Sequence, residues 1–370
     1  MKLLYITNQI CGSGGLERVL AIKTKFLIDN YCHDIHIITL NQESDSNFFD
    51  FSNKIRTHNI TANGSLFARA KSYISGLKSL VNNIKPDIVL VCDDGLKGFF
   101  IPTILQKPCP IIYERHVSRN IMLNENDAIF KTIKTNFYFL LMQILAKNFD
   151  KFVVLTDDNV LEWNTKNIDV IPNPLTFYPD EKSSLTNKTV IAVGKQSYQK
   201  GYDRLLQSWK IVHKKNPDWI LKIFGKFDES QGLVKLTENL KLSSSVQFFN
   251  EDKNIVERFL ESSIFVLSSR YEGFGMVIIE AMACGLPAIS FDCPCGPKEI
   301  ISKNKDGFLI ENGNIRAFAS AINELIADEN LRLQLGTNAR ENVKRFTAEI
   351  VMPQWQKLFN DLHINKNKRQ

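Results

Sequence analysis

The chain lacks any long apolar segment in its 370 residues. Uninterrupted apolar runs such as residues 137–142 fall far short of the roughly 18 residues that a membrane-spanning helix needs. Residues 1–8 likewise contain too short an apolar core for a secretory signal peptide. We therefore expect a cytoplasmic protein, neither secreted nor spanning a membrane.

The seven cysteines follow no pattern typical of a metal site or a disulfide framework. They are scattered, and the one close pair, Cys293 and Cys295, lacks a second pair or a histidine cluster at zinc spacing. An acidic D-x-D loop is also missing, since the aspartate pairs at 93–94 and 157–158 are adjacent and fit turns or helix caps. The sequence therefore predicts reduced thiols, no metal and no cofactor.

Charge of one sign is not concentrated anywhere except in a short basic tail. The net charge is +6, from 46 basic and 40 acidic residues, and dense Lys and Arg occur only at residues 366–369. This pattern excludes nucleic acid as a partner but allows attraction to anionic membranes or substrates. Apolar and charged contents of 44% and 23% are typical of a soluble globular protein, here long enough for two domains.

Residues 263–289 carry the most information. A short apolar run at 264–267 predicts a buried strand, and a glycine-bearing loop follows it. Residues 276–283 predict a helix that ends at Gly285 and Pro287, and the next strand starts at Ala288. Such a βαβ unit binds ligands at the carboxyl end of its first strand, where the free amides of the helix favour an anion.

Two carboxylates in this unit narrow the choice of ligand. Glu280 interrupts an otherwise apolar helix, and burying it costs several kcal/mol unless a partner hydrogen-bonds to it. Glu272 lies eight residues earlier, roughly 12 Å away along a helix, which is too far for a glycosidase pair at about 5 to 9.5 Å. Acceptors at both ends with anion-binding amides between them suit a nucleotide sugar. A salt bridge from Glu280 to a neighbouring Arg or Lys is the alternative.

The segment 272–287 closely resembles the E-x7-E signature of retaining, family-4-type glycosyltransferases of the GT-B fold. The resemblance rests on Glu272-Gly273-Phe274-Gly275, Glu280-Ala281-Met282-Ala283 and Gly285-Leu286-Pro287. It implies an α/β fold of two Rossmann-like, doubly wound parallel-sheet domains that face each other across a cleft. It also implies that Glu280 holds the ribose hydroxyls and Glu272 the sugar hydroxyls of the donor. The donor-binding residues that the resemblance implies in this segment are Glu272, Gly273, Phe274, Gly275, Met276 and Glu280.

A second loop, at residues 194–201, places two lysines at the end of a predicted strand, where they could cradle a diphosphate. It begins at Gly194 and resembles the family's G-R-x4-K-G loop, with Lys195 in place of the usual Arg. Lys195 keeps the charge but loses the bidentate fork, so Lys200 is the better candidate. Asn250 stands where the family's backbone holds the nucleotide base and often has Gly. A solvated loop with lysines is the alternative.

The first half offers fewer candidates. Its loop from Gly12 to Gly15 fails the dinucleotide fingerprint, because the third glycine position is Glu17 and no acid ends the second strand. It resembles the family's GG-x-E-R-V segment instead, which would bring Gly14 and Gly15 near the donor phosphates or the acceptor. A tight turn is the simpler alternative. His116 directly follows a predicted strand, where the family commonly has a His against the donor sugar.

Two further features complete the expectations. The segment Ile171-Pro172-Asn173-Pro174 resembles the family's interdomain boundary and predicts an acceptor-side domain at 1–173, a donor domain at 174–346 and a returning helix with its tail at 347–370. The basic, apolar helix expected at 128–149 could rest on an anionic membrane or be a core helix with a solvated face.

The resemblance implies transfer of a hexose from a nucleotide diphosphate sugar, taken as a UDP-sugar, to a glycan or lipid-linked glycan in surface polysaccharide biosynthesis. His116, Glu272 and Lys200 are the catalytic candidates. No residue stands out as a general base, which agrees with the family's front-face mechanism. A nucleotide-sugar epimerase, a sugar-phosphate synthase and a non-catalytic nucleotide-sugar-binding partner remain alternatives.

Overall fold

A computed structural model describes residues 1–44, 46–119 and 129–367 and divides into two compact units. The first unit comprises Met1–Thr176 and Ala348–Gln370, and the second Phe177–Thr347. The division thus falls after Thr176, close to the boundary expected after Asn173. The expected helix start at residue 128 and the end of the basic tail at 368–370 lie outside the described residues.

The first unit is a seven-stranded parallel sheet in its described part, with the order β3-β2-β1-β4-β5-β6-β7. Its strands are β1 (Lys2–Thr7), β2 (Asp34–Leu40), β3 (Arg56–Ile60), β4 (Ile88–Cys92), β5 (Ile111–Glu114), β6 (Lys151–Val154) and β7 (Ile168–Val170). Its helices are α1 (Gly15–Tyr31), α2 (Leu66–Ile84), α3 (Leu96–Phe99), α4 (Ile101–Leu105), α5 (Ile129–Ala146), α6 (Asp157–Leu161) and α14 (Ala348–Asn367).

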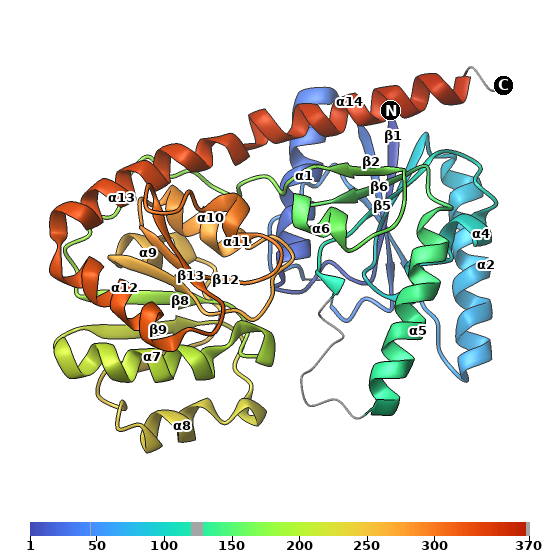
Figure 1. The fold of residues 1–370 in the computed structure, drawn as a ribbon. Coiled ribbons are helices and arrows are strands. Elements are labelled where there is room, and N and C mark those ends of the chain that lie inside the picture. Colours follow the sequence, from blue (N-terminus) through green and yellow to red (C-terminus); the bar gives the residue numbers. More distant parts are fainter. Residues whose placement is uncertain (45, 120–128, 368–370) are drawn as a thin grey trace. The chain divides into compact units, whose positions relative to one another are not determined.

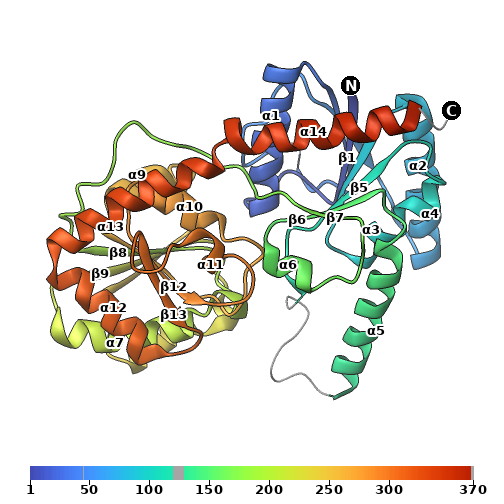
Figure 2. The same ribbon diagram turned by 45° about the horizontal axis from the view of Figure 1, so that its top comes forward.

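Helices cover both faces of this sheet, so its central strands are apolar throughout, as in β4 with its sequence IVLVC. Buried side chains of α2 and α5 pack on one face. On the other face α1 packs beside α14, whose Trp355 and Phe359 are buried there. Figures 1 and 2 show α14 crossing α1 at a steep angle. The last helix is therefore part of the first unit.

The second unit has a six-stranded parallel sheet with the order β10-β9-β8-β11-β12-β13. Its strands are β8 (Thr189–Val193), β9 (Ile220–Phe224), β10 (Val246–Phe249), β11 (Ile264–Leu267), β12 (Ala288–Asp292) and β13 (Gly307–Glu311). Its α-helices are α7 (Tyr202–Lys215), α8 (Leu233–Asn239), α9 (Ile255–Leu260), α10 (Met276–Ala283), α11 (Pro297–Ile300), α12 (Ile315–Ala327) and α13 (Glu329–Asn342). Short 3-10 helices occur at Tyr198–Lys200, Glu229–Gln231 and Val343–Phe346.

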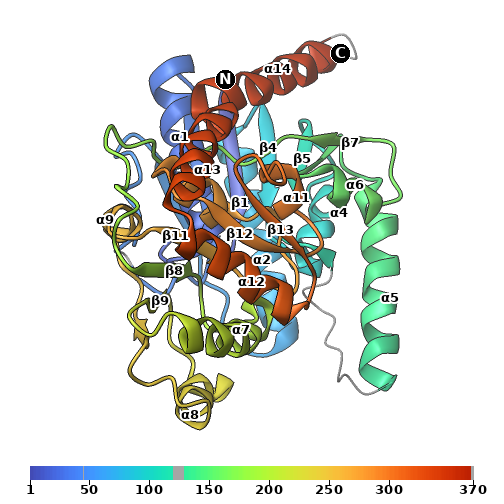
Figure 3. The same cartoon turned by 60° about the vertical axis from the view of Figure 1, so that its left-hand side comes forward.

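A large apolar cluster lies on one face of the second sheet. Apolar side chains of β8, β9 and β11 pack against α7 and α12, and these two helices lie side by side (Figure 3). The expected Rossmann-like, doubly wound sheet is confirmed in each unit. In both sheets the strand order reverses beside the first strand, and this reversal positions the candidate sites.

Candidate functional site

The second unit brings two loops together at the carboxyl ends of its central strands. β8 and β11 are neighbours in the sheet, although β9 and β10 separate them in the sequence. Residues 194–201 follow β8 and residues 268–275 follow β11. Open α/β sheets bind ligands in the crevice at such a switch point, so the geometry supports a binding site at these loops.

Lys200 and Glu272 meet between the two loops. The Lys200 Nζ lies 2.7 Å from Glu272 Oε1, and the Ser269 hydroxyl donates to the same oxygen at 2.5 Å. The side chains of Lys200 and Glu272 are 17% and 7% exposed. A cation and a carboxylate predicted separately from the sequence are thus held as one ion pair, and sequence reasoning missed Ser269.

Glycine permits the close approach of these loops. Gly201 has a φ of +62°, and a Cβ there would lie 2.2 Å from the Ser268 carbonyl oxygen. The Ser268 hydroxyl donates to the Lys200 carbonyl at 2.8 Å. A Cβ on Gly194 would likewise lie 2.9 Å from the Lys200 Cε, because the lysine side chain crosses that glycine. The glycines of the loop therefore set the position of Lys200.

Arg270 fastens the same two loops to each other. It donates to both carboxylate oxygens of Asp203 at 2.9 and 2.8 Å and to the Tyr198 carbonyl at 2.7 Å. Its guanidinium carbon lies 3.9 Å from the centre of the Tyr198 ring. Burial alone would raise the pKa of Asp203, but Arg270 lowers it below its usual value. Sequence reasoning missed this pair, because 67 residues separate its members.

Glu280 lies on α10 and is fully buried, with an exposure of 0%. Gly273, Phe274 and Gly275 are also buried, and Met276 is half-buried. The predicted signature therefore forms a closed surface around the start of α10. The Glu272 side chain is 7% exposed beside the more exposed Lys200, whereas the carboxyl group of Glu280 lies beneath the surface.

Lys195 and Asn250 differ from the Lys200–Glu272 pair in their exposure to solvent. Both residues are exposed. Asn250 follows the edge strand β10, which is two strands away from β8, and at a strand spacing of about 4.8 Å this is roughly 10 Å. A ligand that contacted both Asn250 and Lys200 would therefore extend across the end of the sheet, as a nucleotide does.

In the first unit, the glycine loop closes over an acidic side chain. Gly14 caps α1, and Gly15 is its first residue. A Cβ at Gly12 or Gly14 would lie 2.6 Å from a Glu17 carboxylate oxygen, so these glycines make room for Glu17. Burial raises the pKa of Glu17 above its usual value. The structure thus gives the loop a packing role, and the contact of Gly14 and Gly15 with a donor stays a prediction.

His116 follows β5 and lies beside Glu114, the last residue of that strand. The His116 Nε2 is 3.4 Å from Glu114 Oε2, and the His116 amide donates to Asp94 Oδ1 at 3.2 Å. The same Glu114 oxygen lies 2.6 Å from the Lys23 Nζ of α1. Sequence reasoning identified His116 but missed Lys23 and Glu114, which α1 and β5 bring together across 91 residues.

Cys92, Glu114 and His116 form the one metal-compatible trio found among the described residues, with their ligand atoms within 4.8 Å of one another. Lys23 already supplies a cation to Glu114 at 2.6 Å. Burial, and then Glu114, raise the pKa of the Cys92 thiol well above its usual value. A metal ion would need the Cys92 thiolate, which the raised pKa disfavours. The three residues therefore fit the Lys23 ammonium as their cation better than a metal ion.

Comparison with known proteins identifies the family. Residues 177–342 match the family model described as glycosyl transferases group 1. An uncharacterised glycosyltransferase of Haemophilus influenzae is 31% identical over 363 residues, which cover 96% of this chain and 98% of the relative. The chain belongs to the group 1 glycosyltransferases. The resemblance noted in the sequence is thereby confirmed at the level of the family.

Two further proteins resemble this glycosyltransferase over nearly its whole length. The amylovoran biosynthesis glycosyltransferase AmsD of Erwinia amylovora is 30% identical over 97% of this chain and 99% of its own. The crystal structure of Anabaena HepE in complex with UDP and glucose superposes with a TM-score of 0.79 at 19% identity. It covers 98% of this chain and all of HepE. The fold of the glycosyltransferase is GT-B, as expected.

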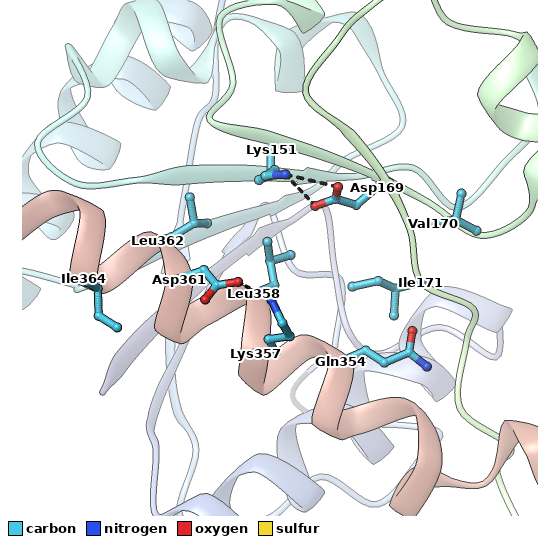
Figure 4. A pocket seen from close by; sticks show the side chains of 10 residues that line it. All are labelled: Lys151, Asp169, Val170, Ile171, Gln354, Lys357, Leu358, Asp361, Leu362 and Ile364. Atoms are coloured by element: carbon cyan, nitrogen blue, oxygen red, sulfur yellow. Dashed lines mark hydrogen bonds and ion pairs between the residues drawn. The ribbon is translucent and has the colours of Figure 1, made fainter.

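A groove of about 810 Å³ lies elsewhere in the first unit of the glycosyltransferase, between α14 and the strands β6 and β7 (Figure 4). Its lining includes two ion pairs, Lys151 with Asp169 at 2.9 Å and Lys357 with Asp361 at 2.6 Å. None of the predicted site residues lines it. The groove is therefore separate from the candidate site.

Among the described residues of the glycosyltransferase, no helix combines the length and apolar character that crossing a membrane requires.

Proposed function

We propose that this glycosyltransferase transfers a hexose from a UDP-sugar to a glycan or lipid-linked glycan of a surface polysaccharide, with retention of anomeric configuration. The observation that carries the proposal is the Lys200–Glu272 pair at the switch point of the second sheet. It sets a cation suited to a diphosphate beside a carboxylate suited to sugar hydroxyls. UDP and glucose bound to HepE and the amylovoran assignment of AmsD support the donor and the product class.

The transfer breaks the bond between the sugar C1 and the diphosphate oxygen and forms a bond between C1 and the acceptor oxygen on the same face. The acceptor proton passes to the departing phosphate oxygen, so no separate general base is needed. Negative charge grows on the diphosphate, and Lys200, Lys195 and the amides around residues 273–276 would stabilise it. Lysines in these positions could meet that charge without a metal ion, so we propose a metal-independent reaction.

Donor binding would rearrange the pair between the loops. The exposed part of Lys200 would turn from Glu272 to the diphosphate, and Glu272 would then accept from the sugar hydroxyls. His116 would lie against the donor sugar. Glu280 would hold the ribose, and because its side chain is fully buried, the residues that cover it would have to move before the ribose could reach it. Asn250 would lie beside the nucleotide base.

The test is to incubate the purified protein with UDP-hexoses, with and without lipid-linked glycan acceptors. Acceptor-dependent UDP release, with an α-linked product from an α-linked donor by NMR, is expected, and chelation of metals should not abolish it. An inverted product would refute retention. A changed sugar epimer, a sugar-phosphate product, or binding without turnover would refute transfer and identify one of the alternatives.

Glu280→Gln provides a sharper test of the donor site. The substitution keeps the shape of the side chain but removes its charge, so we expect weaker UDP-sugar binding and slower turnover. Unchanged donor affinity and turnover would remove Glu280 from the site. Glu324→Gln, on the exposed side of α12, is a matched control that should change neither quantity.

We further propose that α5 rests on an anionic membrane at the inner face of the cell membrane, where a lipid-linked acceptor would be found. Exposed large apolar side chains recur along the helix at Ile133, Phe137, Leu140 and Ile144, with exposures of 54–61%, and this spacing places them on one face. In addition, Leu66 and Phe67 are exposed in the first turn of α2. Both helices start at the carboxyl edge of the sheet, the edge that carries His116.

The positive charge of α2 and α5 favours an anionic membrane over an uncharged surface as their partner. α2 and α5 contain no Asp or Glu. Their exposed cations form no ion pair with a described residue: Arg69, Lys71, Lys78 and Lys134. Apolar side chains between unpaired cations are typical of helices that lie on anionic lipid.

Co-sedimentation with lipid vesicles tests the surface. The protein should bind vesicles that contain phosphatidylglycerol, more weakly at high salt, and should not bind pure phosphatidylcholine. Phe137→Ser with Ile144→Ser should reduce binding without lowering the melting temperature, because both side chains are exposed. Equal binding by this variant, or association of the protein into dimers through α5, would refute the membrane surface.

A further inference from the structure

Two adjacent serines follow β11 and contact the two members of the Lys200–Glu272 pair in different ways. Ser268 and Ser269 are 2% and 0% exposed. The Ser268 hydroxyl donates to the backbone carbonyl of Lys200 at 2.8 Å. The Ser269 hydroxyl donates to the carboxylate of Glu272, where it contacts Oε1 at 2.5 Å. The serines therefore hold the lysine by its main chain and the glutamate by its side chain.

This difference leaves the lysine side chain as the mobile member of the pair. Among the described residues, Glu272 is the one acceptor that the Lys200 Nζ contacts. The lysine side chain is also the more exposed of the two, at 17% against 7%. A flexible four-carbon stem lets the ammonium turn while the main chain stays in place. The pair can therefore open by movement of Lys200 alone.

The Glu272 carboxylate, in contrast, is held from inside the protein. The Glu272 amide donates to the Pro294 carbonyl at 3.0 Å, and Oε1 accepts from Ser269 as well as from Lys200. The other oxygen, Oε2, has no hydrogen-bond partner among the described residues, yet it is not one of their buried unpaired atoms. The 7% exposure of the side chain therefore includes Oε2. One oxygen is bound within the protein, and the other meets solvent.

We propose that Ser269 is a positioning residue that holds Glu272 by Oε1 while Lys200 turns to the diphosphate, so that Oε2 accepts from the donor sugar. Without Ser269, the departure of Lys200 would leave a largely buried carboxylate with no hydrogen-bond partner, which is unfavourable for a charged group. The inference rests on the proposed function, in which the diphosphate attracts Lys200. It implies that Ser269 acts on the sugar part of the donor and not on the nucleotide part.

Calorimetric titration tests this distinction by comparing UDP with UDP-glucose, UDP-galactose and UDP-N-acetylglucosamine. Ser269→Ala should weaken binding of the sugar nucleotide that the wild type prefers by roughly 10- to 100-fold, the range that corresponds to a hydrogen bond with a charged group. Binding of UDP should stay unchanged. Ser208→Ala is the matched control, because Ser208 is also 0% exposed in the second unit but donates to the Arg204 carbonyl. The control should change neither affinity.

A second measurement needs no ligand. Lys200→Met removes the ammonium and so imitates its departure, which makes Ser269 the last described partner of the carboxylate. Ser269→Ala should therefore lower the melting temperature more in K200M than in the wild type, whereas Ser208→Ala should lower it equally in both. Equal losses from Ser269→Ala in the two backgrounds would overturn the proposal. Equal weakening of UDP and sugar-nucleotide binding would also overturn it, because a general structural defect would have that effect.

Failure of the proposed function would give a different result. A wild type that binds none of the three sugar nucleotides would refute that function, and with it the role of Ser269 toward the sugar. Tight binding by the wild type with unchanged binding by folded Ser269→Ala would overturn this inference alone.

Discussion

Replacing Lys200 by methionine should lower both the stability and the activity of the enzyme. At 2.7 Å and an effective dielectric constant of about 20, the attraction between Lys200 and Glu272 is roughly 6 kcal/mol. Removing one partner of a buried pair typically costs about 3–5 kcal/mol. Solvent reaches Lys200, and the Ser269 hydroxyl still donates to Glu272. We therefore expect a loss of stability at the lower end of this range, about 3 kcal/mol. In a unit of this size, such a loss lowers the melting temperature by roughly 6–12 °C.

Activity should fall independently of this loss of stability. A cation aimed at the departing diphosphate acts mainly in the transition state, and losing one such group costs about 10²- to 10³-fold in kcat. K200M/E272Q removes both charges, so the melting temperature should recover while turnover does not. Recovery of the melting temperature would show that the unpaired Glu272 carboxylate causes the loss of stability in K200M, whereas the turnover of K200M itself tests the catalytic role of Lys200.

Thermal unfolding and acceptor-dependent UDP release are the two assays. Lys188→Met is the matched control, because Lys188 forms an exposed ion pair with Asp218 in the same unit, and it should change neither quantity measurably. Wild-type turnover by K200M below its melting temperature would refute the role of Lys200 in stabilising the leaving group. An unchanged melting temperature would refute the buried pair.

Three further changes test the surroundings of the site. Gly201→Ala should lower the free energy of unfolding in urea by about 1–3 kcal/mol, because the new Cβ would lie 2.2 Å from a carbonyl oxygen. Gly232→Ala is the control, since Gly232 has a similar φ of +61° but open space where a Cβ would lie, and it should lower the free energy less. Equal losses in the two variants would contradict the contact at Gly201. Arg270→Lys loses the bidentate contact with Asp203 and should raise the donor KM roughly tenfold, about 1.4 kcal/mol, with little change in melting temperature. An unchanged KM would show that the two loops keep their positions without this contact. Because Lys23 and His116 lower the pKa of Glu114 in the folded protein, its stabilising contribution is present above its unfolded pKa of about 4.3 and is lost as the pH falls through the lower folded value. The wild type should therefore lose stability relative to K23M/E114M in thermal unfolding below that pH, and a constant difference would contradict the shift.

Much of the fold follows from local sequence patterns. Continuous apolar runs such as Ile88–Cys92 and Ile264–Leu267 mark strands that are buried on both faces, and a glycine and a proline mark the end of α10. β3 carries no such pattern, because Arg56–Ile60 is an edge strand with mostly exposed polar side chains. Its pairing with β2 comes from the backbone and leaves no apolar pattern to detect.

The sequence by itself determined the family, the two doubly wound sheets and the identity of Glu272, Lys200 and His116 as candidates. Motif residues lie close together along the chain, so their spacing can be recognised without coordinates. Only the tertiary structure decided which partners these residues have. Glu272 pairs with Lys200 across 72 residues, because parallel strands distant in sequence end at the same edge of a sheet. Glu114 pairs with Lys23 across 91 residues, because α1 packs on the sheet that contains β5. The burial of Glu280 also depends on the tertiary structure. Helices and loops packed around α10 make its side chain inaccessible, and no local sequence pattern could reveal this burial.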